Sequence, residues 1–397
     1  MKHASKFIYL DMLRGVAALT VLVWHVRLLF FLRLSDLPTA AAANYARSMG
    51  IAGKIFFFAT SFGHEAVVVF FVLSGFFIMG SIQRSCSLGK WSPLDYAVSR
   101  LSRLWTVLLP ALFLTWIWDR TGGWAFPDTL QYSGSAFGTG GTLPIECLKP
   151  LFLIGNALFL NTILVPCFGS NIPLWSLAYE FWYYVLFPLF FLAFRAGYSR
   201  PARLLLLVGA LGLSVALLLG NRLLIAYFPI WLMGAIPLYL LRMEKVANLL
   251  RDKWALWAIL ALFAGILVVM RFELVCWMVH GINLRDYALG ICTALLVASL
   301  SGRTAPAGVS RVATFLSDVS YTTYLVHVPL AFFLCAWLVP SKQLFTPTNA
   351  VVFACLVGGI FAYACVCWFL FERNTPRLRL FLSSLITAVR RRATSGK

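Results

Sequence analysis

Long apolar runs recur along the whole sequence, and they constrain the fold more than any other feature. A run of about 17–25 apolar residues is long enough for an α-helix to cross a hydrocarbon core of about 30 Å. Only 12% of the 397 residues are charged and 61% are hydrophobic, which is far from the composition of an average soluble domain. Patterns of period two, which mark strands, are absent. The sequence therefore predicts an all-α, polytopic membrane helical bundle.

Ten segments of the chain are expected to span the membrane. They are residues 11–32, 64–83, 101–118, 176–194, 203–220, 223–241, 254–270, 286–301, 318–339 and 349–371. An eleventh apolar stretch, 151–168, is interrupted by Gly155, Asn156, Asn161 and Pro166. If this stretch does not cross, most of the Lys and Arg residues outside the spans share one side, and the positive-inside rule places that side and both termini in the cytoplasm. We therefore expect 151–168 to be a re-entrant or interfacial segment of a protein of the bacterial cytoplasmic (inner) membrane.

The charge and the cysteines exclude two other classes of protein. The net charge is +19, but the basic residues lie between apolar runs and not among aromatic residues on one surface, so no nucleic-acid partner is expected. The nine cysteines are scattered without zinc-finger or dithiol spacing, so no metal site is expected. The predicted organisation is one membrane domain, residues 1–372, followed by a short basic cytoplasmic tail, residues 373–397.

The first span carries three polar residues, Asp11, Arg14 and His25. Arg14 and His25 are 11 residues apart, and a rotation of about 100° per residue places them on one stripe of a helix, about 16 Å apart along its axis. Asp11 lies one turn before Arg14 and can pair with it. Ionisable groups inside a span are costly and mark functional sites. The alternative is an interfacial pair of Asp11 with Arg14, and a His25 that serves only in packing.

Six segments, in this order along the chain, resemble acyltransferase family 3 of integral membrane proteins. The first is residues 10–25, which begin with LDMLRG and end with His25. The others are FFVLSGF at 70–76, RLSRLW at 100–105, LWSLAYEFWYYVLFP at 174–188, SYTTYLVHVPL at 320–330 and FER at 371–373. The sequence departs from the family pattern at Val68, where many members have an acidic residue, and at Pro110, which lies later than the usual proline. Glu65, one turn before Val68, is a candidate substitute for the missing acid.

The resemblance implies an O-acyltransferase. Such enzymes take an acyl group, usually acetyl from cytoplasmic acetyl-CoA, and place it on a hydroxyl of an extracytoplasmic or lipid-linked carbohydrate, such as an exopolysaccharide, an O-antigen or a Nod-factor-like oligosaccharide. Acetyl-CoA is then a substrate, and no bound cofactor is expected. The family's essential arginine and histidine correspond to Arg14 and His25. The partners are the donor, the glycan acceptor and membrane lipids; the sequence leaves the oligomeric state open.

Acyl transfer to an alcohol needs a base near the hydroxyl, a group that stabilises the oxyanion and a grip on the donor. His25 is the candidate base or, alternatively, a transient acyl carrier. Arg14, Arg100 and Arg103 suit the donor's phosphates, although ordinary positive-inside anchoring also explains the last two. Ser74 offers a small hydroxyl to the donor, and helix packing explains it equally well.

The acceptor is expected to meet residues nearer the external end of the bundle. Glu180 is a candidate catalytic residue that orients His25 or binds sugar hydroxyls, with Ser176 one turn away on the same face. Trp175 is a candidate for stacking on a sugar ring. The alternatives are an aromatic-belt tryptophan and a helix-capping Ser176 or Glu180.

Glu65 and His327 complete the candidate acceptor site. His327 precedes Pro329 by two residues, so its alternative role is to satisfy the carbonyl that this proline frees. Two rival functions remain at this stage. One is a transporter or flippase of a glycan or lipid-linked precursor that uses the buried charges as a proton relay, and the other is a non-catalytic subunit of a polysaccharide export complex.

Overall fold

The computed structural model describes residues 7–133, 143–195, 197–271, 278–279, 282–381 and 384, and within them the fold is almost entirely helical. One pair of two-residue antiparallel strands, β1 (Met278–Val279) and β2 (Ile282–Asn283), lies between helices. The helices are α1 (Ile8–Phe30), α2 (Thr39–Ser48), α3 (Gly50–Ala59), α4 (Gly63–Ser87), α5 (Pro93–Ala125), α6 (Pro150–Ala157), α7 (Leu174–Ala193), α8 (Arg200–Gly220), α9 (Arg222–Leu232), α10 (Ala235–Leu240), α11 (Glu244–Arg251), α12 (Lys253–Val269), α13 (Leu284–Leu300), α14 (Ala307–Leu338) and α15 (Pro347–Leu370), with short 3-10 turns η1 (Leu34–Asp36), η2 (Pro144–Cys147) and η3 (Glu372–Asn374).

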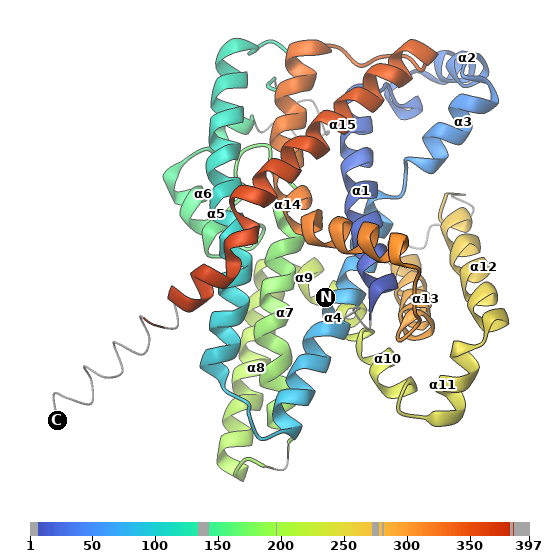
Figure 1. Ribbon diagram of the computed structural model, residues 1–397. Coiled ribbons are helices and arrows are strands. Elements are labelled where there is room, and N and C mark those ends of the chain that lie inside the picture. The colour runs from blue at the N-terminus through green and yellow to red at the C-terminus, as the bar shows by residue number, and fades with distance from the viewer. Residues whose placement is uncertain are drawn as a thin grey trace.

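The predicted class, an all-α polytopic membrane protein, is confirmed. Among the described residues, eight helices are long and apolar enough to cross a bilayer, and there are nine if α11 and α12, which meet at 74°, form one span. The sequence predicted ten, and the difference includes α13, which has 17 residues. Two helices that the sequence did not predict, α2 and α3, follow α1 and lie together at one end of the bundle (Figure 1).

Helix α1 lies at the centre of the bundle and contacts α14, α4 and α15 (Figure 1). It approaches α14 closely at Gly15, where an added Cβ would lie 2.4 Å from the Cβ of Leu316. Real side chains do not approach so closely, so only glycine allows the two helices to meet here. This contact places the polar stripe of α1 directly against α14.

The apolar stretch 151–168 folds back on itself and is not among the spans. Helix α6 ends at Ala157, and the next residues include Phe159 and Thr162 with φ of 59° and 66°. Buried amides satisfy the broken backbone: Asn156 donates to the Pro166 carbonyl and accepts from the Phe168 amide, while Asn161 donates to the Leu174 carbonyl. The interrupting residues therefore hold this turn together, in accord with the rule that backbone groups within a membrane find partners in the protein.

Two prolines inside helices each free a carbonyl, and a side chain from elsewhere captures it. Pro188 in α7 cannot donate to the Tyr184 carbonyl, which accepts instead from the Tyr96 hydroxyl at 3.0 Å. Pro329 in α14 likewise frees the Leu325 carbonyl, which accepts from the Asn171 amide at 2.9 Å. The proline breaks therefore tie α7 to α5, and α14 to Asn171 in the loop before α7.

We expect Asn171→Ala to destabilise the protein by about 1–3 kcal/mol, because the Leu325 carbonyl would stay buried without a donor. Thermal unfolding of the purified protein in detergent measures the effect. Asn248→Ala is the matched control, since Asn248 is exposed on α11. Equal unfolding temperatures for the two variants would contradict this role of Asn171.

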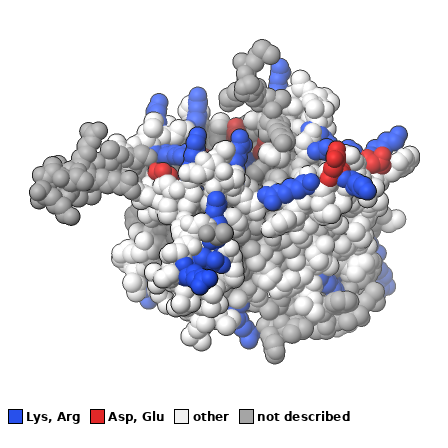
Figure 2. Space-filling model, turned by 90° about the horizontal axis from the view of Figure 1, so that it is seen from below, with Lys and Arg blue, Asp and Glu red and all other residues white. Residues whose placement is uncertain are grey.

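The loops that follow α4, α7, α10 and α13 lie at the end of the bundle where α1 begins and α15 ends, and we call this end the basic face. Figure 2, which views the molecule from below, shows Lys and Arg side chains spread over this face with few acidic ones among them. Arg14 near the start of α1, Arg103 near the start of α5 and Arg373 after α15 line one surface cavity. The first and last described helices thus meet at this face.

Candidate active site

The polar stripe of α1 contacts one helix, α14, at both of its ends. Arg14 donates to the Ser317 hydroxyl, and His25 lies beside His327, with 3.1 Å between His25 Nδ1 and His327 Nε2. Both histidines are buried, at 8% and 0% exposure. The prediction that Arg14 and His25 share a face is therefore confirmed. Sequence reasoning did not foresee that His327 is the neighbour of His25.

The hydrogen bonds around the histidine pair assign the tautomer of each ring. His327 Nδ1 lies 2.9 Å from the Thr323 carbonyl and His25 Nδ1 lies 3.0 Å from the Val21 carbonyl. Because a carbonyl only accepts, each Nδ1 carries the proton in the neutral rings. His327 Nε2 then accepts from His25 Nδ1–H, and the lone pair of His25 is on Nε2. This is the tautomer in which His25 acts as a base through Nε2.

His327 does not satisfy the carbonyl freed by Pro329. That carbonyl belongs to Leu325 and is bonded by Asn171, whereas His327 bonds to Thr323, one turn before it. The alternative role for His327 is therefore wrong, because Asn171 supplies the donor.

Arg14 is held by two partners at the basic-face end of the stripe. Its guanidinium contacts Asp11 at 3.4 Å and the Ser317 hydroxyl, which also donates to Asp11 at 3.0 Å. The predicted pairing of Asp11 with Arg14 is confirmed. The Nε atom of Arg14 is buried without a hydrogen-bond partner among the described residues, so this cation retains unused donor capacity beside the cavities described next.

Two cavities meet at Arg14 and Arg103, which line both. The inner cavity has a volume of about 330 Å³ and lies among α1, α4, α5, α7 and α14. The outer cavity has a volume of about 760 Å³ and reaches Trp368, Glu372 and Arg373 at the basic face. Arg100 also lines the inner cavity. The structure thus brings Arg14, Arg100 and Arg103 together around one continuous site.

Ser74 and Glu180 form a polar cluster in the wall of the inner cavity. The Ser74 hydroxyl donates to Glu180 at 2.5 Å and accepts from Trp231 Nε1 at 3.2 Å, and the Tyr184 hydroxyl also donates to Glu180. The prediction that Glu180 orients His25 is wrong, because Glu180 points to this cluster nearer the basic face and His327 is the residue beside His25. Gly75 allows the close packing, since an added Cβ would lie 2.0 Å from the Trp231 carbonyl oxygen.

Ser176 and Tyr324 close the inner cavity at the end nearer the histidine pair. Their hydroxyls are 2.6 Å apart, and the ring of Tyr324 lies 6.2 Å from that of His327. Helix α7 has no side-chain N-cap, so the capping alternative for Ser176 and Glu180 is wrong. The cavity therefore extends from the arginines to a residue that contacts the histidine pair.

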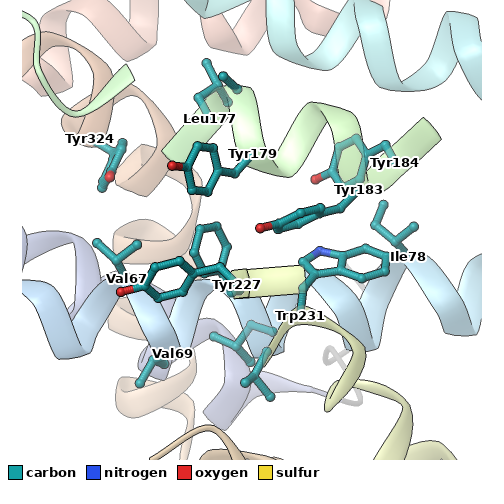
Figure 3. Close-up of a cluster of buried hydrophobic side chains, with 14 of the residues drawn as sticks. Val67, Val69, Ile78, Leu177, Tyr179, Tyr183, Tyr184, Tyr227, Trp231 and Tyr324 are labelled. Carbon is teal, nitrogen blue, oxygen red and sulfur yellow. The ribbon is translucent and has the colours of Figure 1, made fainter. Parts of the chain in front are cut away.

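Aromatic side chains surround the start of α7. Trp175 packs on Phe71, Tyr179 and Tyr227, with ring centroids 5.1–6.1 Å apart. Figure 3 shows Tyr179 and Tyr183 of α7 facing Tyr227 and Trp231 of α9 across this cluster. Trp175 thus belongs to an internal aromatic wall, which packing alone explains and which also presents flat faces of the kind that sugar rings stack on.

Glu65 lies away from the cavities, near the end of the bundle opposite the basic face. It pairs with Arg271, and its neighbour His64 pairs with Asp286 at 2.9 Å. Sequence reasoning missed Arg271, Asp286 and Tyr227 as members of this cluster. An available signal was Asp286, an acid at the first position of a predicted span.

These features define a helical membrane protein with a histidine pair and a basic cavity buried in its core. A model of the acyltransferase domain of acyltransferase family 3 matches residues 7–370, and the chain belongs to this family of membrane acyltransferases. No curated protein and no solved structure matches the chain.

Proposed function

We propose that this protein transfers an acyl group, most readily acetyl from acetyl-CoA, to a hydroxyl of an extracytoplasmic or lipid-linked carbohydrate. The observation that carries the proposal is that Arg14 and His25 both lie against α14. The inner cavity begins at Arg14 and ends at Tyr324, which lies beside His327, the partner of His25. The basic face lies in the cytoplasm of a bacterial inner membrane in this proposal, in accord with the positive-inside rule.

The donor enters at the basic face. Arg14, Arg100, Arg103 and Arg373 are the cations that line the two cavities, and guanidinium groups bind phosphate oxygens in a bidentate way. Coenzyme A carries its phosphates at one end and its thioester at the other. The phosphates bind the arginines in this arrangement, and the acyl end extends along the inner cavity toward the histidine pair, about 16 Å from Arg14 along α1.

The chemistry is a direct transfer with His25 as base. His25 Nε2 takes the proton of the acceptor hydroxyl, and the hydroxyl oxygen attacks the thioester carbonyl carbon. The tetrahedral intermediate then collapses as the carbon–sulfur bond breaks, and the imidazolium returns the proton to the departing thiolate. His327 accepts from His25 Nδ1–H alongside the Val21 carbonyl, and as a positioning residue it helps to hold the ring in the tautomer that carries the lone pair on Nε2. A transient acyl group on His25 is the alternative path to the same ester.

The test uses purified protein in lipid nanodiscs, acetyl-CoA labelled in its acetyl group, and surface glycan from a host that lacks this gene. Release of free CoA together with label in the glycan, detected by mass spectrometry, is the expected result. In liposomes, movement of the glycan across the bilayer without thioester cleavage would instead identify a transporter or flippase. Full glycan acetylation in a host that carries a His25→Ala variant would identify a non-catalytic subunit.

We expect His327→Leu to lower kcat by about two- to tenfold, because His25 loses one neutral hydrogen bond of about 0.5–1.5 kcal/mol that helps to hold its ring in place, while the Val21 carbonyl still accepts from Nδ1–H. The KM values for both substrates should not change. His327→Gln, whose amide oxygen can accept from His25, should restore part of the rate. An equal rate for His327→Leu and the wild type would show that His327 does not position His25.

A further inference from the structure

Two buried carboxylates, Asp286 and Glu65, lie near the end of the bundle opposite the basic face, and His64, the residue before Glu65, binds Asp286. Asp286, in the first turn of α13, is fully buried and accepts through Oδ2 from His64 Nε2 and from the Tyr227 hydroxyl, both at 2.9 Å. Glu65, in the first turn of α4, is 4% exposed and accepts through Oε1 from Arg271. One polar cluster thus receives side chains from α4, α9 and α13, and from Arg271, which follows α12.

Each carboxylate has a second oxygen that remains unused. Among the described residues, Asp286 Oδ1 and Glu65 Oε2 are buried without any hydrogen-bond partner. A buried acceptor without a donor is unfavourable, so native proteins rarely leave one unless a ligand or water completes it. Because two such oxygens belong to the same polar cluster, they indicate a site that a ligand completes.

The chemistry of these two oxygens restricts the ligand. Carboxylate oxygens only accept, so the ligand must donate hydrogen bonds. Each acid already faces its own cationic or imidazole partner, Arg271 or His64, so a ligand that completes the two remaining oxygens need not carry a charge. Hydroxyl groups of a neutral ligand fit both conditions.

The cluster is continuous with the aromatic wall and close to the catalytic histidine. Tyr227, which donates to Asp286, packs on Phe71 and Trp175 with ring centroids 5.9 and 6.1 Å away. Gly63 packs on Trp24, where an added Cβ would lie 2.4 Å from the indole ring. Gly63, the residue before His64, therefore lies against the residue that precedes His25, on the side of the bundle opposite the donor's arginines. His64 and Arg271 keep the cluster accessible, with side chains 38% and 29% exposed.

We propose that Asp286 and Glu65 bind the hydroxyls of the acceptor, with His64, Tyr227 and Arg271 holding the two carboxylates in place. The ligand class is a neutral, polyhydroxylated sugar ring, stacked on the aromatic wall. This inference rests on the proposed acyl transfer and names the residues that recognise its acceptor. It also extends the candidate acceptor site from Glu65 to four residues that no sequence motif contains.

The test measures both substrates separately on the full-length protein in nanodiscs. The variants are Asp286→Asn and Glu65→Gln, and Glu244→Gln, an exposed acid at the basic face, is the matched control. Initial rates are measured against the concentration of glycan from the gene-deleted host, and acetyl-CoA affinity is measured by calorimetry. We expect the glycan KM to rise at least tenfold in both test variants, with unchanged acetyl-CoA affinity, and no change in the control.

Folding is controlled by thermal unfolding and by two milder variants, His64→Gln and Tyr227→Phe, which keep both carboxylates and should raise the glycan KM by a smaller factor. An unchanged glycan KM in Asp286→Asn and Glu65→Gln would overturn the proposal. A loss of acetyl-CoA affinity equal to the loss of glycan affinity would also overturn it, since that indicates a structural role.

Failure of the proposed function is distinguishable from failure of this site. If the wild type transfers no acyl group at all, the proposed function is wrong, and calorimetric titration with the same glycan then tests the site alone. Binding at least tenfold weaker for Asp286→Asn than for the wild type supports the acceptor site, and equal binding overturns it.

Discussion

His25→Ala is expected to abolish acyl transfer while the protein still inserts into the membrane. A positioned general base contributes about 10²- to 10⁴-fold to the rate. Among the described residues, His25 is the side chain of α1 that lies beside His327. The variant also leaves His327 Nε2 buried without its donor, which costs about 1–3 kcal/mol of stability. The loss of activity should therefore far exceed any loss of folded protein.

The measurement is the rate of label transfer from acetyl-CoA to glycan, normalised to the amount of monodisperse protein in detergent. Val16→Ala is the matched control on the same helix, since Val16 is 47% exposed. Acetyl transfer by His25→Ala at the rate of the control would refute the mechanism, for the base and for the acyl-carrier path alike.

Arg14→Lys is expected to lower kcat/KM by about 10- to 100-fold. Lysine keeps the positive charge but replaces the planar fork with a point charge, so at least one charge-assisted hydrogen bond of about 1.5–3 kcal/mol is lost. The partners Asp11 and Ser317 can still bind the ammonium group. The defect should therefore be in donor binding and not in folding.

Acetyl-CoA affinity by calorimetry measures this defect directly. Arg84→Lys is the control, because Arg84 is an exposed arginine of the same face at the end of α4. If Arg14→Lys bound acetyl-CoA as the wild type does, Arg14 would not be a donor ligand, and its role would be limited to joining α1 and α14.

The sequence predicts the spans well, because a long apolar helix is recognised from length and hydropathy alone. It also predicts that 151–168 turns back, since charge on either side of the membrane is an independent constraint. It fails for α2 and α3. Helix α2 is too short and too polar to resemble a span, and α3 continues toward α4 across a break at Thr60 and Ser61 that hydropathy does not reveal.

The candidate site is predictable only where its residues lie on one helix. Helical periodicity relates Arg14 to His25, but it cannot say which helix faces them, so the partnership of His25 with His327 and the separation of Glu180 from His25 were out of reach. The cluster of Asp286, Arg271 and Tyr227 with Glu65 depends on contacts among four helical segments, and those are set by tertiary packing.

The capture of proline-freed carbonyls by Tyr96 and Asn171 has a consequence for how this family varies. Where the helix has no proline, its carbonyl is already bonded and the side-chain donor is not needed. Where the donor is missing, the proline leaves a buried carbonyl without a partner and lowers the stability of the protein. Each proline and its captor, though distant along the chain, are therefore exchanged together or not at all, and related sequences should record Tyr96 with Pro188, and Asn171 with Pro329, as pairs that co-vary.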